Sequence, residues 1–169
     1  MILIVLFLFA VLGIRGAMIT GFSVPIAFFV AFAVLNGMGM TINGIVLFSL
    51  VLSLGLMVDN SIIVMEGITE YITTHNKSPK QASLLAIWNY RWPIISGTMT
   101  TVCAFAPMLL VSGIMGEYIG IIPKTVSVTL IASLFTALII IPTLAARKYK
   151  KINGKNNETT KKHRSVKIN

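Results

Sequence analysis

An apolar run at residues 45–66 is the feature that most limits what this chain can fold into. As an α-helix, its roughly 22 residues would be about 33 Å long, which matches the hydrocarbon core of a bilayer. Asp59 lies inside the run, away from both ends. A carboxylate at that depth costs about 2.5 kcal/mol or more on insertion, unless it faces a bundle interior or a water-filled path. The run therefore predicts a membrane-spanning helix whose acid has a functional role.

The composition places the whole chain in the same class. Of its 169 residues, 56% are hydrophobic and 11% are charged, and its mean hydropathy is +0.87, whereas soluble domains carry about 25% charged residues. The net charge of +9 comes mainly from the C-terminal end, where nine of the 14 Lys and Arg residues follow Ala146. Such a tail is typical of a cytosolic segment beside a membrane, so we expect no nucleic acid partner.

Hydropathy predicts an all-α bundle of about five membrane spans, the first of them too short to be complete. The predicted spans are residues 1–14, 19–35, 45–66, 93–111 and 121–145. A polar connection at 72–92 is expected to contain an amphipathic interfacial helix, because Ser78-Pro79-Lys80-Gln81 has the pattern of a helix N-terminus. Residues 147–169 are expected to form a basic disordered tail.

The basic residues also predict an orientation. If the spans alternate, Arg15, the connection at 72–92 and the tail lie on one side, and Glu117 and Lys124 lie on the other. The positive-inside rule assigns the first side to the cytoplasm. We therefore expect a multi-pass protein of the inner (plasma) membrane with a cytoplasmic C-terminus.

Polar residues inside the spans are the candidate functional residues. Asp59 is interpreted as a proton relay with Asn60 and Ser61 as its neighbours, although an acid that only fixes helix packing is an alternative. Small and hydroxylated residues of the fourth span are expected to pack helices together and hydrogen-bond across them. These residues are Ser96, Thr98, Thr100 and Thr101.

Other chemistries find little support in the sequence. The nine methionines are scattered, which argues against a copper or silver exporter, and no cluster of metal ligands is seen. No nucleophile–base set stands out, so we expect no enzymatic activity. Pro107 and Pro142 lie inside predicted spans and could be hinges or tolerated kinks.

The stretch Gly55-Leu56-Met57-Val58-Asp59-Asn60-Ser61-Ile62-Ile63-Val64-Met65-Glu66 resembles the fourth-helix motif of resistance-nodulation-division (RND) efflux permeases, the AcrB-like multidrug exporters. In that family G-x-x-V-D-[DN]-[AS]-I-x-V-x-E carries the proton-binding acid. Further matches make residues 1–146 similar to helices two to six of the first repeat. They are Val24-Pro25, Gly39-x-x-Ile42-Asn43, the segment 77–82, Phe105-Ala106-Pro107-Met108 and Ile141-Pro142-Thr143-Leu144.

The resemblance implies that Asp59 accepts the coupling proton and that no cofactor is needed. Asn60 stands where the best-known members have a second aspartate, so a site of two carboxylates is not implied. The family's partners would be full-length subunits or a second repeat with its lysine. In a Gram-negative cell, a trimer with a periplasmic adaptor and an outer-membrane channel is implied, exporting drugs or other small amphiphilic compounds.

Several family features lie outside this sequence: the first helix, the two large extracytoplasmic domains and the second repeat. We therefore expect either a fragment of a split or truncated gene or a half-unit that needs a partner. The alternative function is a non-transporting membrane protein, either a sensor resembling sterol-sensing domains or an inert remnant.

Overall fold

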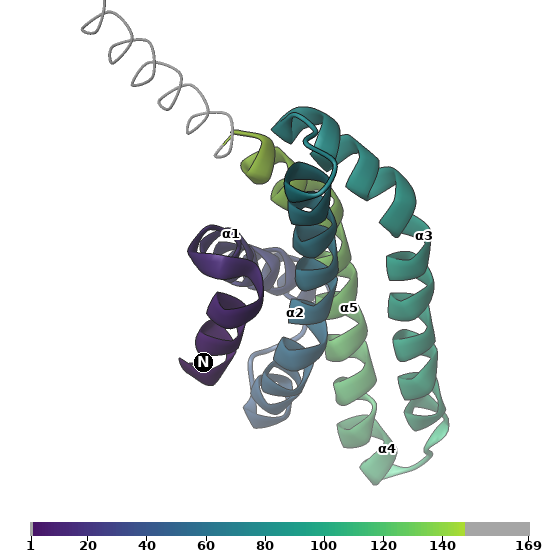
Figure 1. The fold of residues 1–169 in the computed structure, drawn as a ribbon. Helices are drawn as coiled ribbons and strands as arrows, with labels where there is room; N and C mark the ends of the chain where they lie inside the picture. Colours follow the sequence, from purple (N-terminus) through teal and green to yellow (C-terminus); the bar gives the residue numbers. More distant parts are fainter. Residues whose placement is uncertain (1, 148–169) are drawn as a thin grey trace, which may run out of the picture.

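The computed structural model describes residues 2–147, and these fold into a bundle of long helices (Figure 1). Four segments are long and apolar enough to cross a membrane: Leu12–Gly37, Gly44–Thr73, Pro79–Leu110 and Ile114–Arg147. The prediction of an all-α membrane bundle is confirmed. The elements in chain order are α1 (Ile2–Gly37), α2 (Gly44–Thr73), α3 (Pro79–Phe105), the 3₁₀ segment η1 (Ala106–Leu110), α4 (Ile114–Ile119), α5 (Ile121–Phe135) and the π-helix η2 (Thr136–Ile140).

The first helix contains a sharp bend at Gly13. This residue has φ 66° and ψ 174°, a conformation that glycine adopts without the steric cost of a side chain. The bend separates two helical pieces, the first of which contains most of the short apolar run 1–14, and the chain changes direction between them (Figure 1). The predicted spans 1–14 and 19–35 leave a break at residues 15–18, so the bend lies two residues before it.

The turn between α1 and α2 is short and ends on a helix cap. The side-chain oxygen of Asn43 accepts hydrogen bonds from the backbone N–H groups of Ile45 and Val46, at 3.0 and 2.9 Å. These bonds satisfy two of the donors that every helix leaves free at its N-terminus. They fix the start of α2 and so the depth at which its polar residues lie.

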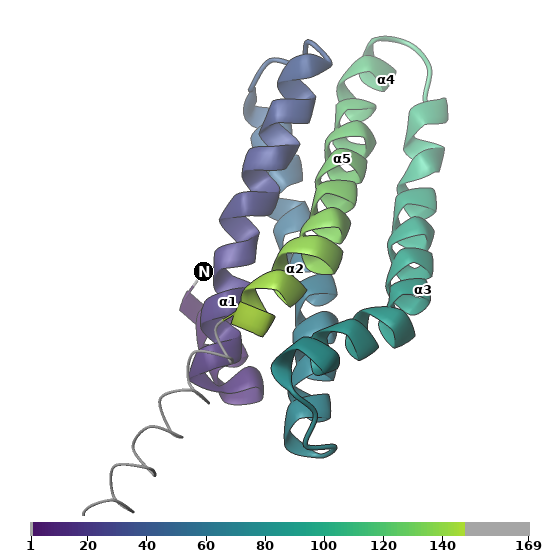
Figure 2. The same cartoon turned by 90° about the horizontal axis from the view of Figure 1, so that it is seen from above.

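The sequence predicts an interfacial helix within residues 72–92 and a span that starts at residue 93. In the structure one continuous helix, α3, covers both. Ser78 caps the helix as its sequence predicts: its hydroxyl accepts from the Gln81 backbone N–H at 3.4 Å and donates to the Gln81 side-chain oxygen at 3.0 Å. The helix then runs without interruption from Pro79 through Pro93 to Phe105 and bends along its length (Figure 2). A proline bends a helix because its ring displaces the preceding turn, and neighbouring helices make this tolerable in a membrane.

The last span contains a π-helical turn before its own proline. In η2 the backbone N–H of Ile141 donates to the Thr136 carbonyl, one residue further back than in an α-helix. Pro142 has no N–H, so it leaves the carbonyl of Leu138 without its usual helical partner. Helical residues 141–147 continue beyond this turn, while the predicted tail after Arg147 lies outside the described residues.

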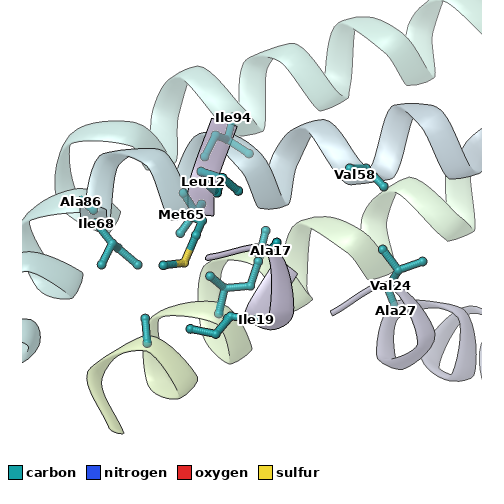
Figure 3. Close-up of a cluster of buried hydrophobic side chains, with 14 of the residues drawn as sticks. Leu12, Ala17, Ile19, Val24, Ala27, Val58, Met65, Ile68, Ala86 and Ile94 are labelled. Atoms are coloured by element: carbon teal, nitrogen blue, oxygen red, sulfur yellow. The ribbon is translucent and has the colours of Figure 1, made fainter. Parts of the chain in front are cut away.

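The core forms where α2 packs against α1, α3 and α5. In Figure 3 the side chains of Leu12, Met65 and Ile68 belong to one cluster of buried apolar residues, and Met65 and Ile68 are fully buried. Gly67 lets the aromatic ring of Tyr90 on α3 approach closely, because a Cβ at this position would lie 2.4 Å from Tyr90 Cε2. This core holds α2 at the centre of the bundle.

Candidate functional site

Asp59 lies near the middle of α2. It is 15 residues after Gly44 and 14 before Thr73, which at 1.5 Å per residue places it about 22 Å from either end of the helix. A carboxyl group at this position is far from both ends of a helix that can cross a membrane. The predicted span 45–66 placed Asp59 seven residues from its end, whereas the longer helix of the structure places it near the middle.

The three central polar residues of α2 do not point the same way. Asn60 and Ser61 are buried against neighbouring helices, whereas Asp59 is exposed on the outer face of the bundle. No hydrogen bond or ion pair joins Asp59 to another side chain within residues 2–147. Its neighbours in sequence are thus held by the bundle, while its own carboxyl group is not.

Asp59 lines a cavity of about 200 Å³ between α2, α3 and α5. Asn60 lies beside it, and Thr98 and Thr101 of α3 and Leu130 of α5 form part of the wall. Polar cavities of this size can hold water. A carboxyl group that lines such a cavity, halfway along an apolar helix, can exchange its proton with water there.

Three hydrogen bonds tie α2 to its neighbours within one turn of Asp59. The Ser133 hydroxyl of α5 donates to the Met57 carbonyl at 2.7 Å, and the Thr98 hydroxyl of α3 donates to the Asn60 side-chain oxygen at 3.3 Å. A third bond of 3.0 Å joins the hydroxyl groups of Ser61 and Ser23. The helix is therefore bonded to α1, α3 and α5 around the acid.

The Ser61–Ser23 pair has a defined direction. The Ser23 hydroxyl donates its only proton to the Thr20 carbonyl at 2.6 Å, so Ser61 must be the donor to Ser23. Asn60 is less fully bonded, because its buried side-chain nitrogen has no partner among the described residues. An unsatisfied buried amide is costly, so it marks a position where another group could bind.

Of the four hydroxylated residues singled out on α3, Thr98 alone bonds to another helix. Ser96 donates to the Pro93 carbonyl, Thr100 to the Ser96 carbonyl and Thr101 to the Gly97 carbonyl, at 3.0, 2.9 and 3.1 Å. Hydroxyl groups in helices commonly make such local bonds to the preceding turn. Ser133, which bonds to α2, was not among the residues predicted from the sequence. A hydroxyl group inside an otherwise apolar helix was the only feature that could have indicated it.

Glu66 lies on the same exposed face of α2 as Asp59 but closer to the helix end. Further along, the Tyr90 hydroxyl of α3 donates to the Glu70 carboxylate at 3.3 Å. The two glutamates therefore belong to the end of the bundle next to the α2–α3 connection, and they do not line the cavity beside Asp59.

Comparison with known proteins identifies the family. The model of the AcrB/AcrD/AcrF family matches residues 1–167. Multidrug resistance protein MdtC of Pectobacterium carotovorum subsp. carotovorum (strain PC1) is 32% identical over 147 residues, which are 87% of this chain and 14% of MdtC. Multidrug resistance protein MdtF of Escherichia coli (strain K12) is 29% identical over 146 residues, 86% of this chain and 14% of MdtF.

This chain therefore covers 14% of the length of each of these two relatives. The matched part includes the four candidate membrane spans and Asp59, and the family is the one that the Gly55–Glu66 stretch resembles. The chain belongs to the AcrB/AcrD/AcrF family of RND permeases.

Proposed function

We propose that this chain is the proton-translocating membrane part of an RND efflux permease and that Asp59 takes up and releases the coupling proton. Its relatives are multidrug resistance proteins, which supports a transport role rather than an enzymatic one. By the same relation, the compounds exported by the assembled permease are drugs or other small amphiphilic molecules.

The observation that carries this proposal is the environment of Asp59. The acid is in the middle of α2, lines a cavity together with Asn60 and two threonines, and has no hydrogen-bond partner within residues 2–147. An acid that served only to fix helix packing would be bonded to a neighbouring hydroxyl or amide. Ionisable groups placed deep in a membrane and facing a polar cavity are typical of proton pathways.

The interhelical bonds around Asp59 supply a route from protonation to movement. Entry of a proton from the outer side neutralises the carboxylate and removes a charge from the centre of the bundle. Since Met57, Asn60 and Ser61 bond to three other helices, a shift of α2 on protonation moves its neighbours as well. Coupling of a local charge change to helix packing is the general basis of such switches.

The proposed topology places Lys77, Lys80 and Arg91 on the cytoplasmic side of the plasma membrane. The C-terminus follows on the same side. The exposed face of α2 that carries Asp59 is where a second repeat with its lysine would pack, as a separate chain or as part of a full-length subunit. In a Gram-negative cell the complete assembly is a trimer with a periplasmic adaptor and an outer-membrane channel.

The test is replacement of Asp59 by Asn in the assembled permease. Asn has nearly the same shape and cannot carry the proton, so proton-driven efflux should be abolished while the amount of protein in the membrane is unchanged. Glu66→Gln is the matched control, because it removes a carboxylate from the same face of α2 and should leave efflux intact. Efflux that survives Asp59→Asn would contradict the proposal and favour a sensor or an inert remnant.

A further inference from the structure

A second, larger cavity lies away from Asp59, between the first two turns of α3 and the end of the last span. Its volume is about 550 Å³, within the range of sites that hold a small ligand. The start of α3 and the last helical turns lie side by side in both views of the fold (Figures 1 and 2). None of its lining residues is used by the proposed proton pathway.

The lining of this cavity combines apolar walls with two cations. Leu84 and Ile87 of α3 face Leu138 and Ile139 of the last span, and Lys80 and Arg147 line the same cavity. Within residues 2–147, no Asp or Glu is among the lining residues. In the described part of the chain, neither cation forms an ion pair.

The two hydroxyl groups of the lining are already committed. Ser83 donates to the Pro79 carbonyl at 2.8 Å and Thr143 donates to the Ile139 carbonyl at 2.7 Å, each within its own helix. Lys80 and Arg147 are consequently the groups left to meet the polar part of a ligand, and that part must be anionic.

The position of the cavity indicates what kind of molecule reaches it. Trp88 and Trp92 follow on the same stretch of α3 and are exposed, with the Arg91 guanidinium 3.8 Å from the centroid of the Trp88 ring. Exposed tryptophans beside a cation are typical of the level where lipid headgroups meet acyl chains. The cavity thus has its cations at headgroup level and apolar walls for a chain.

We propose that this cavity binds an anionic phospholipid of the cytoplasmic leaflet. Lys80 and Arg147 hold the phosphate, and an acyl chain lies against the apolar walls. A soluble anion would leave these walls without a function, and an uncharged lipid would leave the two cations without one. Basic pockets between membrane helices on the cytoplasmic side are suited to such headgroups.

Tryptophan fluorescence provides a local readout. The chain has two tryptophans, so Trp92→Phe leaves Trp88, which directly follows the lining residue Ile87. The full chain with this substitution is reconstituted into phosphatidylcholine vesicles with increasing phosphatidylglycerol, one of the two lipids carrying brominated chains that quench fluorescence on contact. The quenching gives the binding constant of phosphatidylglycerol relative to phosphatidylcholine beside Trp88.

The expected result is a preference for phosphatidylglycerol that falls by about fivefold on Lys80→Gln and by a similar factor on Arg147→Gln, since each cation near the surface contributes about that much to anionic-lipid binding. Lys124→Gln is the matched control, because it removes a cation from the start of α5, outside the cavity lining, and should change nothing. Circular dichroism should show unchanged helix content in every variant.

Three outcomes would overturn the proposal. Equal quenching by the two brominated lipids would mean that the cavity does not select the headgroup charge. A preference that persists in both the Lys80 and the Arg147 variant would mean that the selective site is elsewhere. Equal quenching by the two lipids, together with binding of inorganic phosphate that is lost on Lys80→Gln, would mean that a free phosphate ion, and not a lipid, is the ligand.

Discussion

The buried, inward face of α2 and its exposed, outward face differ in whether their polar groups are hydrogen-bonded to other helices. On the inward face, Met57, Asn60 and Ser61 each take part in a hydrogen bond to a different helix. On the outward face, Asp59 has no such partner within residues 2–147, although it is adjacent to Asn60 in the sequence. Groups bonded to another helix hold the bundle together, whereas the Asp59 carboxyl group, without such a bond, is free to react or to bind. The buried side-chain nitrogen of Asn60, which has no partner among the described residues, is the exception on the inward face.

The largest stability effect is expected from a methyl group added on the inward face. In Gly67→Ala the new Cβ would lie 2.4 Å from Tyr90 Cε2, so the ring must move or α2 and α3 must separate. Such overpacking typically costs about 1–3 kcal/mol. The free energy of unfolding, measured by denaturant titration in detergent, should fall by this amount.

Gly55→Ala provides the control for that substitution on the outward face, since a Cβ at Gly55 would meet no atom within 4 Å. Here alanine should be neutral or slightly stabilising, because it has the higher helix propensity. Equal losses from the two substitutions would show that packing against Tyr90 does not distinguish the two faces.

A smaller loss is expected when an interhelical bond is removed. Ser133→Ala deletes the bond to the Met57 carbonyl, which keeps its ordinary helical partner on α2. Interhelical hydrogen bonds in membranes contribute about 0.6 kcal/mol on average, so the unfolding free energy should fall by about that much. Ser127→Ala on the same helix has no such bond to lose in the described part of the chain and should cost less; a reversed order would refute the role given to Ser133.

The smallest effect is expected on the outward face near the helix end. Glu66 is exposed, so Glu66→Gln should leave both the unfolding free energy and the efflux activity of the assembled permease within experimental error. If this change stopped efflux as completely as Asp59→Asn, then the position of Asp59 along α2 and its adjacent cavity would not explain why efflux depends on it.

Much of the fold could be predicted because membrane-spanning helices are recognised in a sequence by their length and hydropathy. The turn before α2, the break near Gly13 and the Ser78 cap all follow from local residue types. The continuity of α3 through Pro93 could not be read in the same way, because a proline is compatible with either a helix start or a bend.

The inner faces of the helices were harder to predict. A span that is apolar all round has no polar face to point outward, so its periodicity does not show which hydroxyl groups meet another helix. The sequence therefore does not separate Thr98 from Thr100, and it does not pair Ser133 with Met57, 76 positions away. The sequence placed Asp59 inside a helix of membrane-spanning length, but its exposure on the outward face required the structure.

The central claim is that Asp59 takes up a proton from the outer side. It is the single aspartate of the chain, so labelling with aspartate carrying ¹³C at the side-chain carboxyl carbon gives one resonance. The chemical shift of this resonance differs between the carboxylate and the carboxylic acid. Subtracting the Asp59→Asn spectrum isolates this resonance even when a partner chain is also labelled. The measurement is made in oriented vesicles in which only one side is acidified.

We predict that acidifying the outer side alone moves the Asp59 resonance toward the carboxylic acid, while Glu66→Gln leaves this response unchanged. A resonance that stays in place, or that follows only the pH of the cytoplasmic side, would contradict the proposed proton pathway.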